Sequence, residues 1–160
     1  MKAIVVYSSQ TGNTKKLAET VCEALPAGTQ MCMVDDAPNP SDYDLVALGF
    51  WLQAGKPDPK STSYLARLKG HQNVFLFATH GARPGSDHAT NAMAHAHALA
   101  EGATVAGSFS CYGEVNPNVL EKVKAKPQPP VWLDDAAEAV GHPESADLDN
   151  LLATLKSALQ

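Results

Sequence analysis

The chain has 160 residues, 44% of them hydrophobic, and 17 acidic against 12 basic side chains give it a formal net charge of −5. This length suits one domain, residues 1–160, that can bury a full core without disulfides or a structural metal. The sequence lacks the basic footprint of a nucleic-acid-binding protein and any apolar run near the roughly 20 residues of a membrane span. We therefore expect no nucleic-acid partner and no membrane insertion.

The cysteines indicate a reducing environment. Cys22, Cys32 and Cys111 form no Cys-x-x-Cys pair, and their odd number argues against a disulfide framework. No positively charged leader precedes an apolar stretch. The expected location is the cytoplasm.

A hydroxyl-rich turn follows the first predicted strand. Residues 3–7 are apolar and rich in β-branched side chains, which predicts a strand buried on both faces. Apolar residues then recur at helical spacing from Thr14 to about Leu25. The turn between them, residues 8–13, lies where free backbone N–H groups and the positive end of a helix dipole meet. We therefore predict an anion-binding turn, in which Gly12 allows a conformation that a Cβ would resist.

The composition of this turn narrows the choice of anion. It holds no lysine or arginine, so its donors are neutral: main-chain N–H groups, the Asn13 amide and the hydroxyls of Ser9, Thr11 and Thr14. The chain contains neither the lysine-bearing phosphate loop of nucleotide triphosphatases nor the Gly-x-Gly-x-x-Gly pattern of dinucleotide-binding proteins. A phosphate monoester is the expected ligand. The alternative is a turn that only caps the helix.

Four further strands are predicted, and helical patterns separate them. The apolar runs lie at residues 30–34, 45–50, 74–78 and 104–109. Strands that alternate with helices are typical of a parallel sheet with helices on both faces. The sequence therefore predicts the α/β class.

Helix starts and the last helix are also marked in the sequence. Asp58 and Asn116, each followed by a proline, and Ser86 are predicted N-caps. The last helix lies near residues 144–159, and its leucines are predicted to pack on the sheet as one stripe: Leu148, Leu151, Leu152, Leu155 and Leu159.

Residues 126–143 interrupt the alternation. The sequence Lys-Pro-Gln-Pro-Pro at 126–130 cannot continue a helix, and Trp132 follows it. A tryptophan ring is seldom left exposed. We predict an ordered wrap in which Trp132 anchors the segment against the body of the protein.

Three loops are expected to meet over one site. In a parallel sheet, ligands bind beyond the carboxyl ends of the strands. The turn at 8–13 should therefore lie beside the loops at 51–58 and 79–85.

Two aromatic residues are candidates to stack on a flat ligand. Trp51 lies at the end of a predicted strand, and a buried core position is the alternative for it. Tyr112, at the end of the last strand, is the second candidate. Phe50 continues an apolar run, which favours the core, whereas Thr79 and the N–H groups near Gly81 can meet the polar edge of a heterocycle.

Three histidines in one predicted helix do not form a metal site. His95 and His97 point about 200° apart on a helix, and His88 lies two turns before His95. These side chains cannot share one ion. We expect no metal.

Several motifs together resemble the flavodoxin family. They are the Ser-x-Thr-Gly-Asn-Thr turn at 9–14, the Gly-Phe-Trp of residues 49–51 with a following Gly-Lys, Thr-x-Gly-Ala at 79–82, Phe-x-Cys-x-Gly at 109–113, and His142-Pro143. The resemblance spans nearly the whole chain. It is greatest to a group of short flavodoxin-like FMN proteins that includes subunits of bacterial bilirubin reductases.

This resemblance implies a fold, a cofactor and a set of contacts. The implied fold is a three-layer sandwich with a five-stranded parallel sheet, in the order 2-1-3-4-5, and helices on both faces. The implied cofactor is FMN, whose phosphate lies in the turn at 9–14. The implied cofactor-binding residues are Ser8, Ser9, Gln10, Thr11, Gly12, Asn13, Thr14, Phe50, Trp51, Leu52, Gly55, Lys56, Thr79, His80, Gly81, Ala82, Pro84, His88, Cys111, Tyr112 and Gly113.

Three functions follow as hypotheses. The first is an electron carrier that docks transiently on redox proteins and has no catalytic residue of its own. The second is a small FMN-dependent reductase, or the flavin subunit of one, in which His80 or His88 delivers a proton. The third is a flavin-free regulatory module on the same fold. Because the ring loops carry Lys56, Arg83 and histidines, we also expect the reduced flavin to be less destabilised than in acidic flavodoxins.

Overall fold

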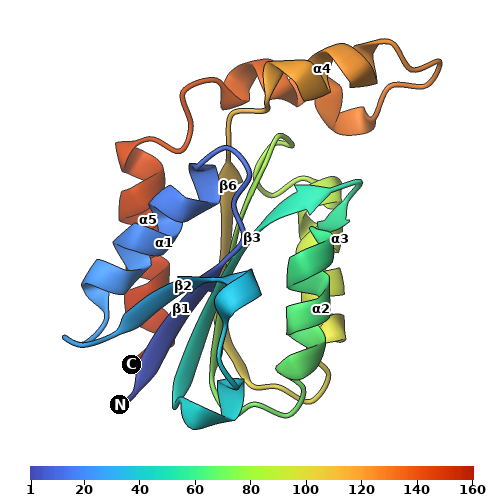
Figure 1. Ribbon diagram of the computed structural model, residues 1–160. Helices are drawn as coiled ribbons and strands as arrows, with labels where there is room; N and C mark the ends of the chain where they lie inside the picture. Colours follow the sequence, from blue (N-terminus) through green and yellow to red (C-terminus); the bar gives the residue numbers. More distant parts are fainter.

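Five parallel strands form the centre of the computed structural model, which describes residues 1–160 (Figure 1). They are β1 (Ala3–Tyr7), β2 (Gln30–Met33), β3 (Leu45–Gln53), β5 (Val74–His80) and β6 (Val105–Tyr112), in the order β2-β1-β3-β5-β6. A two-residue strand, β4 (Lys56–Pro57), pairs antiparallel with the end of β3. Counted without β4, this is the predicted order 2-1-3-4-5, which is therefore confirmed.

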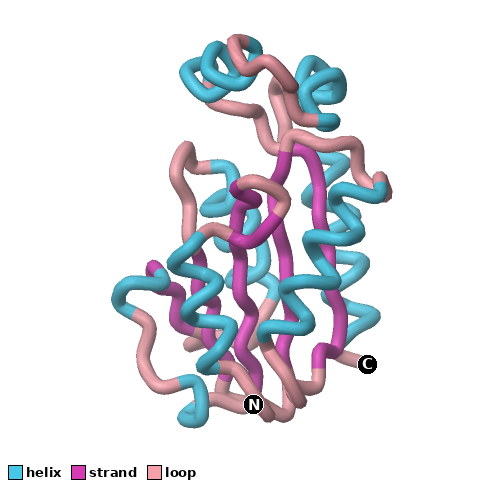
Figure 2. Tube along the Cα trace, turned by 90° about the vertical axis from the view of Figure 1, so that its right-hand side faces the viewer, coloured by secondary structure: helices cyan, strands magenta, loops and turns pink.

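Two helical layers cover the sheet. Helices α1 (Asn13–Ala24) and α5 (Ser145–Ala158) pack together on one face, and α2 (Pro59–Arg67) and α3 (Asp87–Leu99) pack together on the other (Figures 1 and 2). Short 3-10 turns at Val34–Asp36 and Pro40–Asp42 link β2 to β3. The predicted three-layer α/β sandwich is confirmed. No helix is both long and apolar enough to cross a membrane.

The core consists of two apolar clusters, one on each face of the sheet. Alternate side chains of a strand point to opposite faces, so Val5 belongs to one cluster and its neighbours Ile4 and Val6 to the other. Because both faces are covered, the central strands are apolar over most of their length, as their sequences predicted, and polar residues appear only at their carboxyl ends. The clusters hold the carboxyl ends of β1, β3 and β5 side by side.

The three predicted helix caps are confirmed. The side chains of Asp58, Ser86 and Asn116 accept hydrogen bonds from the backbone N–H groups of Ser61, Ala89 and Asn118. Helix α1 differs, because its N-cap is Gly12, which has φ of 92° and no side chain to cap the helix. The first amides of α1 are therefore left to another partner.

The predicted leucine stripe of the last helix is partly wrong. Leu151 and Leu155 are buried and Leu148 packs beside them, but Leu152 and Leu159 are 36% and 37% exposed. Successive helical residues are separated by about 100°, so Leu152 turns away from the face that carries Leu151.

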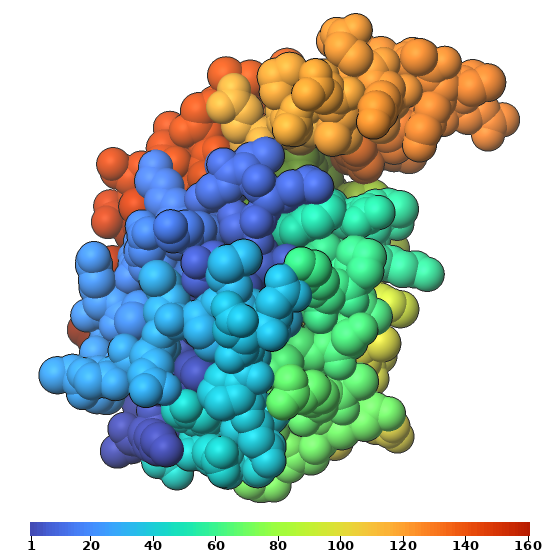
Figure 3. All heavy atoms as spheres, viewed as in Figure 1, coloured from blue at the N-terminus to red at the C-terminus, as the bar shows by residue number.

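Residues 114–141 form a separate layer, here called the roof. It contains α4 (Pro117–Lys124) and a 3-10 helix, η3 (Val131–Ala139), and it overhangs the carboxyl ends of the strands (Figures 1 and 3). The predicted ordered wrap is thus present. Its position above the sheet, rather than flat against the body, was not predicted.

Candidate functional site

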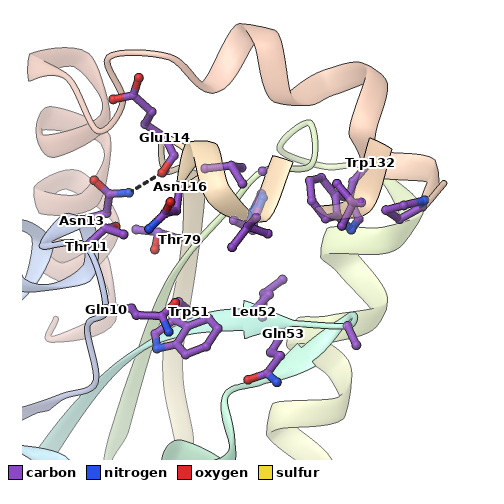
Figure 4. A pocket seen from close by; sticks show the side chains of 18 of the residues that line it. Gln10, Thr11, Asn13, Trp51, Leu52, Gln53, Thr79, Glu114, Asn116 and Trp132 are labelled. Atoms are coloured by element: carbon purple, nitrogen blue, oxygen red, sulfur yellow. Dashed lines mark hydrogen bonds between the residues drawn. The ribbon is translucent and has the colours of Figure 1, made fainter. Parts of the chain in front are cut away.

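A pocket of about 660 Å³ lies between the carboxyl ends of the strands and the roof (Figure 4). Four parts of the chain enclose it: the turn before α1, the β3–β4 hairpin, the end of β5 with the start of α3, and the underside of the roof. The lining residues are Ser9, Gln10, Thr11, Asn13, Thr14, Trp51, Leu52, Gln53, Ala54, Gly55, Thr79, His80, Gly81, His88, Gly113, Glu114, Val115, Asn116, Val119, Val123, Lys126, Pro130 and Trp132.

One end of the pocket is the predicted anion-binding turn. The Gly12 N–H donates to the Ser9 hydroxyl at 3.1 Å, which shapes the turn. Thr14 is buried and its hydroxyl pairs with that of Thr79 at 3.0 Å, while the Asn13 amide donates to the Glu114 carbonyl at 2.9 Å. Each of these two side chains makes one hydrogen bond within the protein. The main-chain N–H groups at the start of α1 and the exposed Thr11 hydroxyl remain for an anion.

A buried carboxylate supports this turn from behind. Asp58 is 1% exposed and accepts hydrogen bonds from the Ser8 hydroxyl at 2.9 Å, the Ser61 N–H at 3.1 Å and the Ser61 hydroxyl at 2.9 Å. The Trp51 N–H lies 3.4 Å from its second oxygen. Asp58 thus ties the end of β1 to the end of β3. It was predicted only as a helix cap.

The hairpin and the roof provide two aromatic walls. Trp51 is half-buried at the end of β3, on the lower side of the pocket in Figure 4, and Trp132 hangs from the roof on the opposite side. A Cβ at Gly81 would come 2.5 Å from the Val115 side chain and 3.3 Å from the Trp132 ring. The roof therefore packs closely on the loop after β5, and Trp132 anchors it there as predicted.

His80, the last residue of β5, is a neutral acceptor in the pocket wall. Its Nδ1 lies 2.9 Å from the Ala82 carbonyl oxygen, which can only accept, so Nδ1 carries the proton. Burial lowers the pKa of His80 from 6.5 to about 4, and the nearby His88 lowers it further although the Ala82 bond opposes the shift. At neutral pH, Nε2 therefore presents a lone pair. It has no hydrogen-bond partner in the protein.

The lowered pKa of His80 makes stability depend on pH. Between pH 6.5 and 4, His80 is protonated in the unfolded chain but stays neutral in the folded chain, so the folded state loses stability as the pH falls. We expect the wild type to lose about 3 kcal/mol more of its free energy of unfolding than His80→Leu between pH 7.5 and pH 4. Urea titrations of both proteins at a series of pH values measure this. Parallel curves would contradict it.

Most of the predicted contact residues lie around the pocket, but not all of them do. Those that line it are Ser9, Gln10, Thr11, Asn13, Thr14, Trp51, Leu52, Gly55, Thr79, His80, Gly81, His88 and Gly113. Gly12 lies in the same turn and shapes it through its backbone. Those found elsewhere are Ser8, which bonds Asp58, Phe50, which is in the core, and Lys56, Ala82, Pro84, Cys111 and Tyr112.

Tyr112 is committed to another role. Its ring lies against that of His142, with the centroids 5.3 Å apart, and its hydroxyl donates to Glu138 of the roof at 2.9 Å. Desolvation and the bond to Glu138 raise the pKa of Tyr112 to about 12. Tyr112 therefore holds the roof, and Trp132 occupies the pocket wall where a second ring was expected.

The charges around the pocket also differ from expectation. Lys56 and Arg83 do not line it, and the Arg83 main-chain N–H instead donates to Asp135 of the roof at 3.1 Å. The charged residues that line the pocket are Glu114 and Lys126, one of each sign. The pocket wall is thus nearly balanced in formal charge rather than basic.

The roof residues of the pocket were missed by sequence reasoning. Val115, Val119, Val123 and Trp132 line it from above, yet only the predicted helix cap at Asn116, the proline-rich break and the isolated tryptophan marked this region. The spacing of Val119 and Val123 fits one face of a helix, which in retrospect was the available signal. No pattern within the α4 segment indicated that the face carrying Val119 and Val123 would cover the carboxyl ends of the strands.

Comparison with known proteins identifies similar chains. A model of the flavodoxin domain matches residues 4–156. The flavodoxin-like domain-containing protein BilS of Clostridioides difficile (strain CD3) is 30% identical over 129 residues, which cover 78% of this chain and 73% of that protein. The protein of the same name from Clostridium symbiosum (strain WAL-14163) is 29% identical over 174 residues, covering 92% and 90%.

Solved structures share the fold at low sequence identity. A short-chain flavodoxin associated with a bacterial microcompartment matches with a TM-score of 0.65 and 13% identity, covering 99% of this chain and 97% of that one. A flavoprotein from Lactobacillus acidophilus NCFM, in complex with FMN, matches with a TM-score of 0.56 and 20% identity, covering 68% and 92%.

Proposed function

The chain belongs to the flavodoxin-domain family, and from this membership we propose that it binds one FMN in the pocket and transfers electrons between redox proteins. The observation that carries the proposal is the continuity of the pocket, which joins the uncapped turn before α1 at one end to an aromatic-walled cavity at the other. FMN has the matching shape, a phosphate joined through a flexible chain to a flat ring system.

The phosphate end fits the chemistry of the turn. Helices α2, α3 and α4 have side-chain oxygens that cap them, whereas α1 begins at Gly12 with none. Its first N–H groups would donate to the phosphate oxygens together with the Thr11 hydroxyl, and the helix dipole favours the negative charge. The absence of a lysine in the turn suits a single phosphate rather than a triphosphate.

The ring end fits a flat and largely apolar heterocycle. Trp51 and Leu52 would form its lower wall, and Val115, Val119 and Trp132 would cover it from the roof. Flat rings bury well between aromatic and aliphatic side chains, with a few polar groups at their edges. The roof would exclude water from one face of the ring.

The protein's own contribution is binding and shielding. Bound FMN supplies reversible one- and two-electron chemistry. The pocket wall holds no pair of carboxylic acids, and His80 is neutral with its only proton given to a backbone carbonyl, so it donates no proton to a substrate. This supports an electron carrier over a reductase that relies on His80. In a reductase, His88 would be the pocket histidine that delivers the proton.

Three free cysteines fit a reducing compartment such as the cytoplasm.

A titration of the purified chain tests the proposal. Both tryptophans line the pocket, so FMN is expected to quench most of the tryptophan emission at one equivalent, and denaturation should release a yellow flavin. A colourless protein whose tryptophan emission does not change on addition of FMN would refute flavin binding. Partner function is tested separately, by reducing the FMN-loaded protein and measuring electron transfer to a second redox protein.

Truncation of Trp51 tests the ring wall. Because stacked aromatic contacts contribute about 0.5–1.5 kcal/mol beyond their buried area, Trp51→Leu is expected to raise the Kd for FMN about tenfold. Trp51→Phe keeps a flat ring and is the matched control, with a Kd within about threefold of the wild type. Equal affinities of the leucine and phenylalanine variants would place the ring elsewhere.

The reductase remains a second candidate because of the roof. Its apolar underside leaves a sheltered space that could admit a small organic acceptor beside the ring. Steady oxidation of NAD(P)H with such an acceptor, by the FMN-loaded chain alone, would favour this function. The carrier hypothesis expects no turnover until a second redox protein is added.

A further inference from the structure

His80 leaves an acceptor unused at the wall of the pocket. Two buried side-chain atoms of the protein lack a hydrogen-bond partner, the Tyr64 hydroxyl oxygen and His80 Nε2. Tyr64 belongs to the apolar cluster between α2 and the sheet, whereas His80 lines the pocket and is 6% exposed. A buried polar atom without a partner is rare and calls for an explanation, such as a ligand.

The tautomer of His80 fixes what kind of partner is missing. The Ala82 carbonyl at 2.9 Å takes the proton on Nδ1, so Nε2 of the neutral ring has a lone pair and no proton. It can only accept. No donor of the protein lies within hydrogen-bond distance of Nε2, because that atom has no partner in the structure.

The position of His80 in the sheet selects one part of FMN. The anion-binding turn follows β1, and β5 lies two strands away in the order β1-β3-β5, which is about 10 Å between strand ends. With the phosphate at the turn, the ring system rather than the phosphate would reach the end of β5. The oxidised flavin ring has a single N–H, the imide N3–H between the two carbonyls of its pyrimidine edge.

We propose that His80 is a specificity-determining residue whose Nε2 accepts a hydrogen bond from the imide N3–H of the flavin ring. The inference rests on the proposed binding of FMN. It orients the ring with its pyrimidine edge toward the end of β5. The acceptor-only tautomer also rejects a flat ring that presents another acceptor at this position, because two lone pairs would face each other.

An N3-methylated flavin tests this contact without any change to the protein. The methyl group removes the N–H, so wild type is expected to bind 3-methyl-FMN about tenfold more weakly than FMN. His80→Leu should bind FMN about as weakly as the wild type binds the analogue, and should not distinguish the two ligands. Tyr64→Phe, which removes the other unpartnered buried atom, is the control and keeps the wild-type discrimination.

The outcomes separate this inference from the proposed function. If wild type binds neither flavin, the proposed function fails. If it binds both flavins equally, or if His80→Leu still discriminates against the methylated one, FMN binding stands and the His80 contact is refuted. A ¹⁵N NMR spectrum of the wild type gives a second readout: the Nε2 resonance should shift on addition of FMN and shift less with 3-methyl-FMN. An Nε2 resonance that moves equally with both would also overturn the contact.

Discussion

Riboflavin is expected to bind this protein about 1,000-fold more weakly than FMN. The turn before α1 offers uncapped main-chain N–H groups and the exposed Thr11 hydroxyl. Charge-assisted hydrogen bonds contribute about 1.5–3 kcal/mol each, so losing two or three of them costs about 4 kcal/mol. Calorimetric or fluorescence titration with each flavin measures the ratio.

Two controls make this result specific to the turn. Thr11→Val should weaken FMN binding about tenfold and leave riboflavin binding unchanged, because riboflavin has no phosphate for the hydroxyl to meet. Inorganic phosphate should compete with FMN and not with riboflavin. Riboflavin that binds within tenfold of FMN would show that the phosphate does not occupy this turn.

Asp58→Ala is expected to lower the free energy of unfolding by about 4 kcal/mol. Asp58 is almost fully buried and accepts hydrogen bonds from Ser8 and, through both the N–H and the hydroxyl, from Ser61. Truncation removes a helix cap and leaves these donors buried without partners. Urea unfolding of the flavin-free protein at pH 7 measures the loss.

The matched control for Asp58→Ala is another helix cap. Ser86→Ala removes the side-chain oxygen that accepts from the Ala89 N–H at 3.3 Å, in a half-buried position with no further donor. It should cost about 1 kcal/mol, as an ordinary N-cap does. Similar losses in the two variants would mean that the contact from Asp58 to Ser8 contributes little, and that Asp58 acts only as a cap.

The buried strands, the helix caps and the turn before α1 could be predicted from the sequence because each depends on a few neighbouring residues. β-branched runs predict buried strands, a proline after Asp58 or Asn116 marks a helix start, and the glycine and hydroxyls of residues 9–14 predict an anion-binding turn. The exposure of Leu152 was not predicted, because the five leucines follow the helical period; Leu152 lies about 100° from Leu151, at the edge of the stripe that faces away from the core. The β3–β4 hairpin was missed because a two-residue strand has no pattern to recognise.

The sequence by itself determined the fold class and the turn before α1, because both depend on periodicity or turn chemistry within a few residues. The strand order followed only from the resemblance of its motifs to the flavodoxin family. Only the tertiary structure decided that the roof covers the strand ends, that Trp132 rather than Tyr112 faces the pocket, and that His80 lacks a partner at Nε2. Those properties arise from contacts between residues far apart in the chain. The burial and the hydrogen-bond partners of a side chain depend on all the segments that pack around it, so they cannot be predicted from any one segment alone.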